Sequence, residues 1–435
     1  MSLKVLVMDA THGGFSVAHE YEKRGAEVTL VDCYGTGTEM LEAEARKAGV
    51  HIVRKTPEGF FDLVVSPIHC PDHFLKGATW EKKITTHQAV GELCSFKSRI
   101  VEVTGTKGKT TTSHLIAHLL RSQGRRVLML SSAGIVLYDD GQTKILKREA
   151  SIAPTTILEV ANMNVEFDVG VFEVSLGGTS NADTGVITTI ENNYPIAAGT
   201  RKAYDGKVQM VQNSKNTLVI RKAEEGIWTS QARQGLKIVT FGAGGDVEVR
   251  IVSKLLLGSK TKVEILFGKD CRVTADLSSR FIAPAYVPSI SAAAAVAFDF
   301  GLEVDDIGRS LSSFDGVQGR AEISCHKNSW IIRDRNPGVS AASIGYLLEC
   351  MKSYSDLKKI SLVVEPVSKR VCEKLDVSEI EKIISTQRDF IDGAYLLSDS
   401  NELNQARHTF EIIKSVDDVR KKSDAILWCT KEGFR

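Results

Sequence analysis

A strand-like segment near residue 100 runs into a glycine-rich turn and then into a helical pattern. Arg99–Thr104 (RIVEVT) is followed by Gly105–Thr112 (GTKGKTTT), and Ser113–Leu120 (SHLIAHLL) has helical spacing. This order points backbone N–H groups and the positive end of a helix dipole at one concavity, which suits a chain of phosphates. The segment therefore predicts a phosphate-binding loop carried by a parallel α/β sheet.

The residue types in this turn fit a nucleoside triphosphate. Gly105 and Gly108 allow the backbone to approach the phosphates closely. Lys109 would bridge the β and γ phosphates, and the hydroxyl of Thr110 would bind Mg²⁺. Val103 stands where the standard GxxxxGK[ST] pattern has its first glycine, so a chance turn is the alternative, which the flanking strand and helix disfavour. The predicted nucleotide-binding residues of the turn are Gly105, Thr106, Lys107, Gly108, Lys109, Thr110 and Thr111.

A carboxylate lies within an apolar segment further along the chain. Glu173 stands inside Asp168–Ser175 (DVGVFEVS), among residues expected to be buried. A buried carboxylate without a partner is costly. Because Mg²⁺ favours one or two carboxylates together with phosphate oxygens, Glu173 and Thr110 are predicted to be its ligands. The alternative is a structural ion pair between Glu173 and a helix Lys or Arg.

Charge and composition exclude several classes of protein. The chain has 55 basic and 54 acidic residues, a formal net charge of +1, so nothing global attracts it to nucleic acid or to a membrane surface. No apolar stretch approaches the length of a membrane span, and Met1–Val7 is too short for a signal peptide. The cysteines are scattered without a CxxC pattern, as expected of reduced thiols. We expect a cytoplasmic monomer or homodimer with no nucleic-acid or membrane partner.

Strands alternate with helical stretches, which predicts an α/β fold with parallel sheets built of βαβ units. Asp246–Val252 and Lys262–Phe267 alternate with period two, which suggests a small antiparallel insertion. Helices are expected at Tyr286–Phe300 and Val339–Met351. The other candidate strands are Lys4–Met8, Glu27–Val31, Phe61–Ser66, Arg99–Thr104, Arg126–Leu130, Asp168–Val174, Gly185–Ile190, Thr217–Ile220, Lys237–Phe241, Trp330–Arg333, Ile360–Glu365, Ala394–Ser398 and Ala425–Cys429.

Five motifs resemble those of the Mur ligase family and follow one another in the family's order. The phosphate turn and Phe172–Ser175 (FEVS) match its P-loop and its Glu-x-Ser segment. Leu63–Pro67 (LVVSP) is similar to a strand end of its N-terminal domain. Gly319–Glu322 (GRAE) matches its GRxE hinge, and the dipeptide Asn336-Pro337 matches part of its HNP loop. The resemblance covers the whole chain.

This resemblance implies a three-domain Mur ligase architecture. Residues 1–95 would form an N-terminal Rossmann-like substrate domain, residues 96–320 a central P-loop ATPase domain with a parallel sheet, and residues 321–435 a C-terminal Rossmann-like domain. The family joins a carboxylate to a nucleophile through an acyl phosphate, using ATP and Mg²⁺. Lys109, Glu173 and Arg320 would then be catalytic, and closure of the third domain would bring Asp334 and Asn336 to the nucleotide.

The chain also departs from the family pattern. Most members carry an Asp-His pair where this sequence has Asn193-Tyr194, and Lys107 occupies a position that is usually Asn. These departures indicate an unusual substrate. Phe172–Gly178 and Asp9–Gly14 are similar to one branch of the family, which makes the nickel tetrapyrrole coenzyme F(430) in methanogenic archaea.

That branch activates a propionate side chain of a nickel seco-tetrapyrrole with ATP, and a carbon of the same molecule closes the ring. The alternative within the family is an amide-forming ligase, such as an archaeal pseudomurein peptide ligase. A dinucleotide-dependent reductase is disfavoured because Asp9–Gly14 lacks the GxGxxG fingerprint. An inactive binding module is disfavoured because Lys109, Thr110 and Glu173 occur together.

Two groups of residues are candidates for contact with this substrate. The family places the remote end of its substrate on the N-terminal domain, which makes Thr11, His12 and Gly13 candidates, although a plain turn explains them equally well. Asn193 and Tyr194 stand at the altered motif. A macrocycle with many carboxylates would need cations, and the basic residues that follow this motif could supply them or form a solvated helix face. These basic residues are Arg201, Lys202 and Lys207.

A short segment of the expected N-terminal domain contains possible metal ligands. His69, Cys70 and His73 lie close together in sequence, but Pro71 forces a turn and no fourth ligand stands nearby. We therefore expect a loop at the edge of the first domain rather than a metal site.

Overall fold

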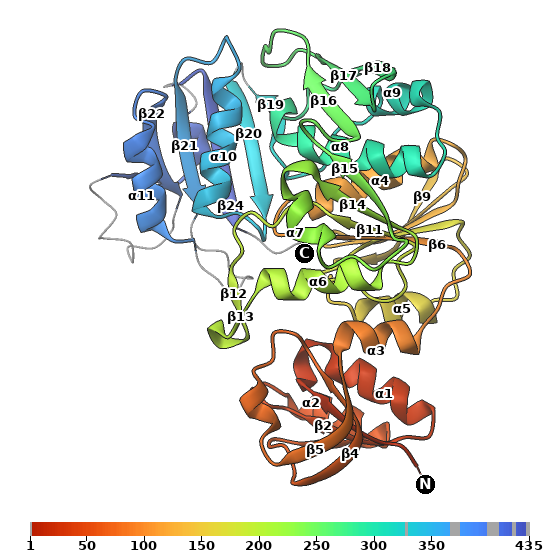
Figure 1. The fold of residues 1–435 in the computed structure, drawn as a ribbon. Coiled ribbons are helices and arrows are strands. Elements are labelled where there is room, and N and C mark those ends of the chain that lie inside the picture. The colour runs from red at the N-terminus through yellow and green to blue at the C-terminus, as the bar shows by residue number, and fades with distance from the viewer. Residues whose placement is uncertain (1, 327–328, 366–374, 398–408, 420–422, 432–435) are drawn as a thin grey trace. The chain divides into compact units, whose positions relative to one another are not determined.

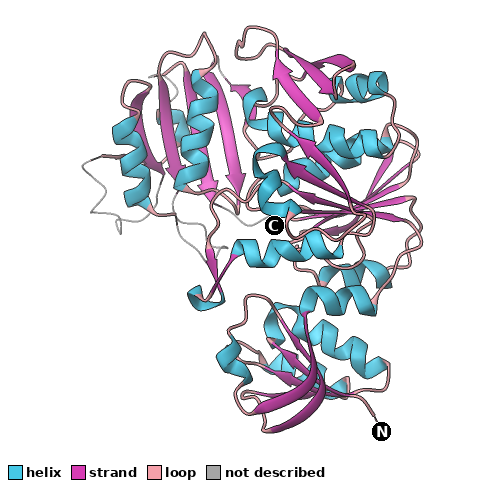
Figure 2. Ribbon diagram, in the orientation of Figure 1, coloured by secondary structure: helices cyan, strands magenta, loops and turns pink. Residues whose placement is uncertain are grey.

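The computed structural model describes residues 2–326, 329–365, 375–397, 409–419 and 423–431. By its internal contacts the chain forms two compact units, Met1–Gly245 and Asp246–Arg435. Helices and strands alternate through both units, as Figures 1 and 2 show. Among the described residues, no helix is both long enough and apolar enough to cross a membrane. The sequence-based domain boundaries at 95/96 and 320/321 remain predictions.

The first unit begins with a parallel sheet of the order β3-β2-β1-β4-β5. From β1 the chain adds β2 and β3 toward one edge of the sheet, and then adds β4 and β5 toward the other edge. The strand order therefore reverses between β1 and β4. Ligands of open α/β sheets bind at such a point, beside the carboxyl ends of the strands. The elements are β1 (Lys4–Met8), η1 (Ala10–Gly14), α1 (Phe15–Lys23), β2 (Glu27–Val31), α2 (Glu39–Lys47), β3 (His51–Val53), β4 (Gly59–Ser66), η2 (Asp72–Leu75), β5 (Ala78–Thr85) and α3 (Thr86–Leu93).

The remainder of this unit is a larger sheet, with its strands in the order β15-β14-β11-β6-β10-β7-β8-β9. Neighbours from β15 to β7 are parallel, and β8 and β9 continue the sheet as antiparallel strands. The strands are β6 (Arg99–Thr104), β7 (Val127–Ser131), β8 (Gly134–Asp139), β9 (Gln142–Arg148), β10 (Val169–Glu173), β11 (Thr184–Ile187), β14 (Thr217–Arg221) and β15 (Lys237–Phe241). The helices are α4 (Lys109–Arg121), α5 (Thr156–Asn162), α6 (Ala203–Asn213) and α7 (Glu225–Thr229), and the short strands β12 (Pro195–Ile196) and β13 (Arg201–Lys202) form a hairpin around η3 (Ala197–Gly199).

Burial explains the apolar sequence of the central strands. Val101 and Val103 in β6, and Val171 in β10, are fully buried, as expected of strands covered on both faces. By contrast, β9 reads QTKILKR and is mostly exposed, which is why periodicity did not reveal it. Where α3 begins, Thr85 and Gln88 form a capping box that satisfies the first amides of the helix.

The second unit starts with an antiparallel sheet of β16, β17 and β18, followed by α8 and α9. It ends with a sheet of the order β19-β20-β24-β21-β22-β23, in which only the β19–β20 pair is antiparallel among the described strands. The elements are β16 (Val247–Ile251), β17 (Thr261–Phe267), β18 (Cys271–Leu277), α8 (Ala283–Asp299), α9 (Val304–Ser312), β19 (Glu322–His326), β20 (Ser329–Asn336), α10 (Ala341–Lys352), β21 (Ile360–Glu365), α11 (Val377–Thr386), β22 (Ile391–Leu397), β23 (Glu411–Ile413) and β24 (Ala425–Lys431).

Each predicted strand and helix overlaps an observed one, with ends shifted by a few residues. The expected α/β class and the antiparallel insertion are confirmed. The strand expected at Gly185–Ile190 is wrong in extent, because β11 ends at Ile187 and the hydroxyl of Thr188 donates to the carbonyl of Lys107. Ser398, predicted to end a strand, lies outside the described residues.

Candidate active site

The glycine-rich turn follows the carboxyl end of β6, between β10 and β11. Gly105 has a φ of +146°, and a Cβ on it would lie 1.9 Å from the hydroxyl oxygen of Thr188. Gly108 has a φ of +79° and immediately precedes α4. Residue 105 needs a positive φ and has no room for a Cβ, and only glycine satisfies both conditions. The turn can therefore bring backbone amides and the start of α4 close to an anion.

Hydrogen bonds tie this turn to the segment after β11. The amide of Thr106 donates to the carbonyl of Thr189 over 2.9 Å. The Thr106 hydroxyl donates to the carbonyl of Glu191, and the Thr188 hydroxyl donates to that of Lys107. The turn is thereby fastened at Thr106 and Lys107 to the segment that follows β11.

Thr110 and Glu173, the predicted metal ligands, lie together. The hydroxyl of Thr110, in the first turn of α4, donates to one carboxylate oxygen of Glu173 over 3.0 Å. The amide of Ser132, just after β7, donates to the other oxygen over 3.2 Å. Glu173 is 2% exposed, so a cation beside Thr110 would compensate a carboxylate that is costly to bury. This oxygen-only pair suits Mg²⁺ bound to phosphate oxygens.

Two lysines near the turn interact electrostatically. The Lys109 ammonium donates to the carbonyl of Gly105 over 3.1 Å. Lys207, in α6, is fully buried, and its ammonium has no hydrogen-bond partner within the described part of the chain. Burial, together with the charge of Lys109, lowers the pKa of Lys207 to about 7. The solvated helix face considered for Lys207 is therefore wrong, because this side chain points into the interior.

His87 reaches the same region from α3. Its Nε2 bonds the carbonyl of Ser175 over 2.8 Å, just beyond the end of β10. Burial lowers the pKa of His87 to about 4, so the ring is neutral near pH 7. No sequence pattern points to His87, since a single histidine in a helical pattern carries no spacing information.

In the second unit, the predicted Arg320, Asp334 and Asn336 are neighbours. The side-chain amide of Asn336 donates to Asp334 over 2.9 Å, and the amide of Ala321 donates to Asp334 over 3.4 Å. Burial raises the pKa of Asp334, while the charge of Arg320 opposes that rise. Tyr286 donates its hydroxyl to the carbonyl of Arg320 over 2.8 Å. The role of this group at the nucleotide remains a prediction.

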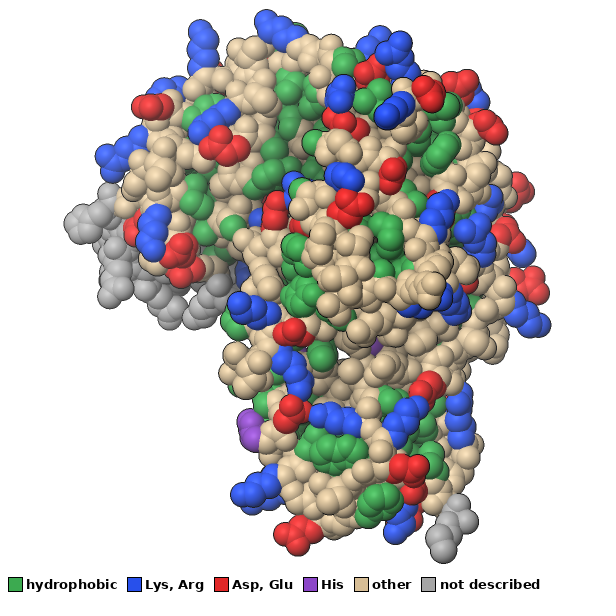
Figure 3. Space-filling view, viewed as in Figure 1, with side chains coloured by type: hydrophobic (Ala, Val, Ile, Leu, Met, Phe, Trp, Pro, Cys, Tyr) green, Lys and Arg blue, Asp and Glu red, His purple; other side chains and the backbone are tan. Residues whose placement is uncertain are grey.

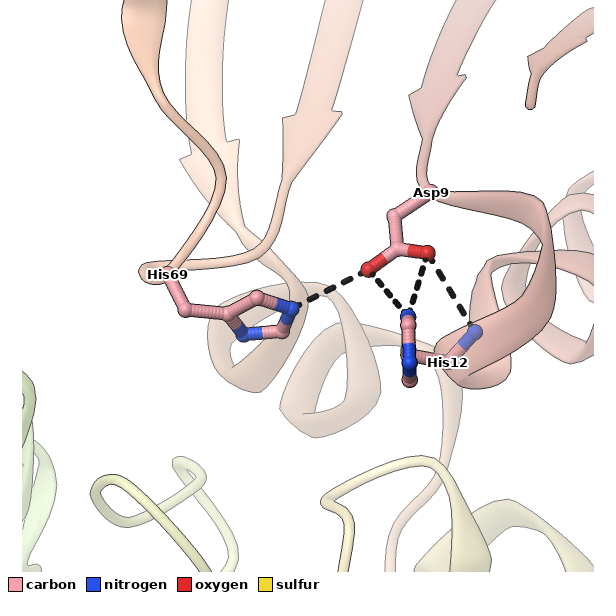
Figure 4. Close-up of side chains that lie close together, drawn as sticks. All are labelled: Asp9, His12 and His69. Carbon is pink, nitrogen blue, oxygen red and sulfur yellow. Dashed lines mark hydrogen bonds and ion pairs between the residues drawn. The ribbon is translucent and has the colours of Figure 1, made fainter. Parts of the chain in front are cut away.

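The candidate substrate residues Thr11, His12 and Gly13 lie in η1, directly after β1. Asp9, the residue between β1 and η1, is 1% exposed and accepts hydrogen bonds from His12 and from His69 (Figure 4). Burial alone would raise the pKa of Asp9, but the bonds from His69 and His12 lower it below its ordinary value. His12, a predicted substrate contact, and His69, in the segment with possible metal ligands, thus bond the same carboxylate.

The other candidates flank the β12–β13 hairpin. Asn193 accepts a hydrogen bond from the amide of Tyr204 over 2.8 Å, and Tyr194 is 45% exposed. Arg201 donates to Asp72 over 2.6 Å and to the carbonyl of Ile68 over 3.0 Å. Arg201 therefore fixes the hairpin to the loop after β4.

Basic and acidic side chains are interspersed over the surface drawn in Figure 3, in keeping with the net charge of +1.

Comparison with known proteins agrees with this geometry. Residues 103–297 match the family model of the Mur ligase middle domain. This part of the chain is similar to a Mur ligase middle domain. Among solved structures, the MurF ligase of Thermotoga maritima in complex with ADP superposes with a TM-score of 0.59 at 17% identity, covering 87% of this chain and 92% of that chain. The Mur ligase architecture predicted from the sequence is confirmed.

Two curated relatives of this Mur ligase-like chain share one name. The coenzyme F(430) synthetase of Methanosarcina acetivorans is 28% identical, over 87% of this chain and 86% of its own length. The coenzyme F(430) synthetase of Methanocaldococcus jannaschii is 26% identical, over 97% of each chain. The predicted resemblance to this branch of the Mur ligases is confirmed.

Proposed function

We propose that the chain is an ATP- and Mg²⁺-dependent ligase that closes the carbocyclic ring of coenzyme F(430). The substrate would be a nickel seco-tetrapyrrole acid, and the products would be the closed macrocycle, ADP and phosphate. The Mur ligase fold and the two relatives support this reading. The observation that carries the chemistry is the hydrogen bond between Thr110, at the start of α4, and Glu173, at the end of β10, beside the glycine-rich turn.

Each residue of this site has a defined task in the proposed reaction. Backbone amides of residues 107–110 and the Lys109 ammonium bind the phosphates and neutralise their charge. Thr110 and Glu173 hold Mg²⁺, which supplies positive charge to the phosphate oxygens when bound. The substrate propionate oxygen attacks the γ-phosphorus, ADP leaves, and an acyl phosphate forms. Phosphoryl transfer at this site thus turns the carboxylate oxygen, a poor leaving group, into phosphate, which leaves readily.

Ring closure then needs a nucleophile within the same molecule. A carbon of the macrocycle gives up its proton and attacks the acyl carbon, a carbon–carbon bond forms, and phosphate leaves. We propose Lys207 as the group that accepts the proton of this carbon. Its pKa lies at about 7, so its neutral form is available near neutral pH. An intramolecular nucleophile also requires no pocket for an incoming amino acid. The Asn193-Tyr194 pair, in place of Asp-His, fits that difference.

Mass spectrometry tests the proposal directly. Purified chain is incubated with ATP, Mg²⁺ and the nickel seco-tetrapyrrole acid, with no amine present. We expect a product lighter by one water, with matching release of ADP and phosphate. Lys109→Met should abolish conversion, whereas Lys47→Met, at an exposed position of α2, should leave it unchanged.

A different outcome would redirect the assignment. If product forms only when an amine is added, and its mass equals the sum of acid and amine less water, the chain is an amide-forming ligase such as a pseudomurein peptide ligase. If a chain that binds ATP converts neither substrate, ring closure is not its activity.

A further inference from the structure

A second cluster of chemistry-bearing side chains lies in the N-terminal sheet, apart from the phosphate turn. Asp9 directly follows β1, His12 lies in η1, and His69 follows the end of β4 by three residues. Figure 4 shows the two imidazole rings converging on the Asp9 carboxylate from different elements. One candidate ligand atom from each residue lies within 4.8 Å of the others. The cluster therefore occupies the carboxyl edge of the sheet, where β1 and β4 reverse the strand order.

The distances fit coordination of one ion. The Nδ1 of His12 lies 2.8 Å from one Asp9 oxygen, and the Nε2 of His69 lies 3.0 Å from the other. Ligand atoms about 2.1 Å from a transition metal and about 90° apart would be separated by about 3 Å. An ion would replace the shared protons, and a neutral imidazole can carry its proton on the other ring nitrogen instead. Small side-chain rotations are then enough to make all three atoms ligands.

Burial and backbone geometry also set Asp9 apart from a surface carboxylate. It is 1% exposed, whereas the side chain of His12 is 60% exposed and that of His69 32% exposed. Asp9 adopts a left-handed conformation with a φ of 68°, and a π-turn follows it. Strained backbone and π-turns are concentrated at functional sites. The site thus has a buried anionic base and a face that solvent reaches.

We propose that Asp9, His12 and His69 form a binding site for one divalent transition-metal ion, such as Zn²⁺, Co²⁺ or Ni²⁺. Two imidazoles and one carboxylate favour these ions over Mg²⁺, which prefers oxygen ligands. Three protein ligands leave coordination positions open for water or for an anionic oxygen of a bound molecule. The site is separate from the oxygen-only pair Thr110 and Glu173, and it does not depend on the ring-closing activity.

Metal binding is measured on the untagged full-length chain. The protein is dialysed against Zn²⁺ or Co²⁺ in a large molar excess of Mg²⁺, and bound metal is counted by mass spectrometry. We expect one ion per chain and a visible Co²⁺ absorption that a chelator removes. His12→Gln, His69→Gln and Asp9→Asn should each weaken binding by more than about 100-fold, since loss of a ligand costs more than loss of an outer partner.

The variants are chosen to separate ligation from folding. Asn is similar to Asp in size and tolerates a positive φ, and His69 is partly exposed, so both substitutions should leave the circular dichroism spectrum unchanged. His73→Gln is the matched control, because His73 is an exposed histidine four residues from His69. Absence of a bound ion in the wild type, or equal loss of binding in His73→Gln, would overturn the site.

Discussion

Replacing Lys207 with methionine should stabilise the first unit near neutral pH. The lysine is fully buried without a hydrogen-bond partner in the described residues, and its pKa falls from 10.5 to about 7. At about 1.4 kcal/mol per pKa unit, the folded state loses about 5 kcal/mol relative to one with an ordinary lysine, once the pH is below 7. Methionine has a similar shape and no charge to desolvate, so Lys207→Met removes this cost.

The pH dependence of this effect follows from the two pKa values. Between pH 7 and 10.5 the unfolded chain retains a proton that the folded chain has released, so the wild-type free energy of unfolding rises with pH. The stabilisation of Lys207→Met should therefore be about 4 kcal/mol at pH 7 and about 2 kcal/mol at pH 9. Any difference in packing between lysine and methionine is the same at both pH values and cancels from the comparison.

Urea denaturation of the wild type and the variant, at pH 7 and pH 9, measures both quantities. The fluorescence of Trp228, fully buried in the same unit, reports the transition. Lys47→Met at an exposed position should give equal midpoints to the wild type at both pH values. A Lys207→Met difference that does not change with pH would refute a buried lysine with a lowered pKa. Stabilisation accompanied by loss of turnover would mark Lys207 as part of the active site.

Three further predictions test the phosphate turn, its metal ligands and the strand that leads into the turn. Gly105→Ala should abolish ATP binding in a calorimetric titration, because a Cβ there meets a hydroxyl at 1.9 Å, whereas Gly124→Ala, also at a positive φ but with nothing within 4 Å, should leave binding unchanged. Thr110→Val and Glu173→Gln should remove the increase in ATP affinity that Mg²⁺ produces and leave affinity in a chelator unaltered; an unchanged Mg²⁺ effect would contradict the metal assignment. Burial raises the pKa of Glu102 from 4.5 to about 7, although hydrogen bonds from Thr179 oppose it. The wild-type free energy of unfolding should therefore fall by about 3 kcal/mol as the pH rises from 4.5 to 7, and urea midpoints of Glu102→Gln should lack this decline.

The phosphate turn could be predicted because its signal is local. Strand, glycines, lysine and helix follow one another within about twenty residues, and each has its own composition cue. Pairing of Glu173 with Thr110 was also predictable, since Glu173 ends one apolar strand of a parallel sheet and Thr110 begins the helix that follows another. β8 and β9 were missed because they are an antiparallel extension whose outer strand is polar and exposed.

The remaining site residues depend on packing that no short window contains. The basic residues after Asn193 look alike in sequence, yet Lys207 turns inward from α6 while Arg201 bonds Asp72. The sequence predicts a plain loop around His69, because no further ligand stands near it in sequence. Its partner Asp9 is sixty residues earlier and reaches it only because β1 and β4 are neighbours in the sheet.

The bonds between the glycine-rich turn and the segment after β11 have a consequence for the order of events. Thr106, Thr188 and Thr189 fasten the turn to the residues that lead directly to Asn193. Nucleotide that rigidifies the turn would also rigidify the approach to Asn193, so a second ligand would lose less conformational entropy on binding there. Thermodynamic reciprocity then requires that a ligand held at Asn193 tighten nucleotide binding by the same factor. Each of the two substrates would then increase the affinity for the other. Unproductive consumption of ATP would be suppressed when the ligand at Asn193 is missing.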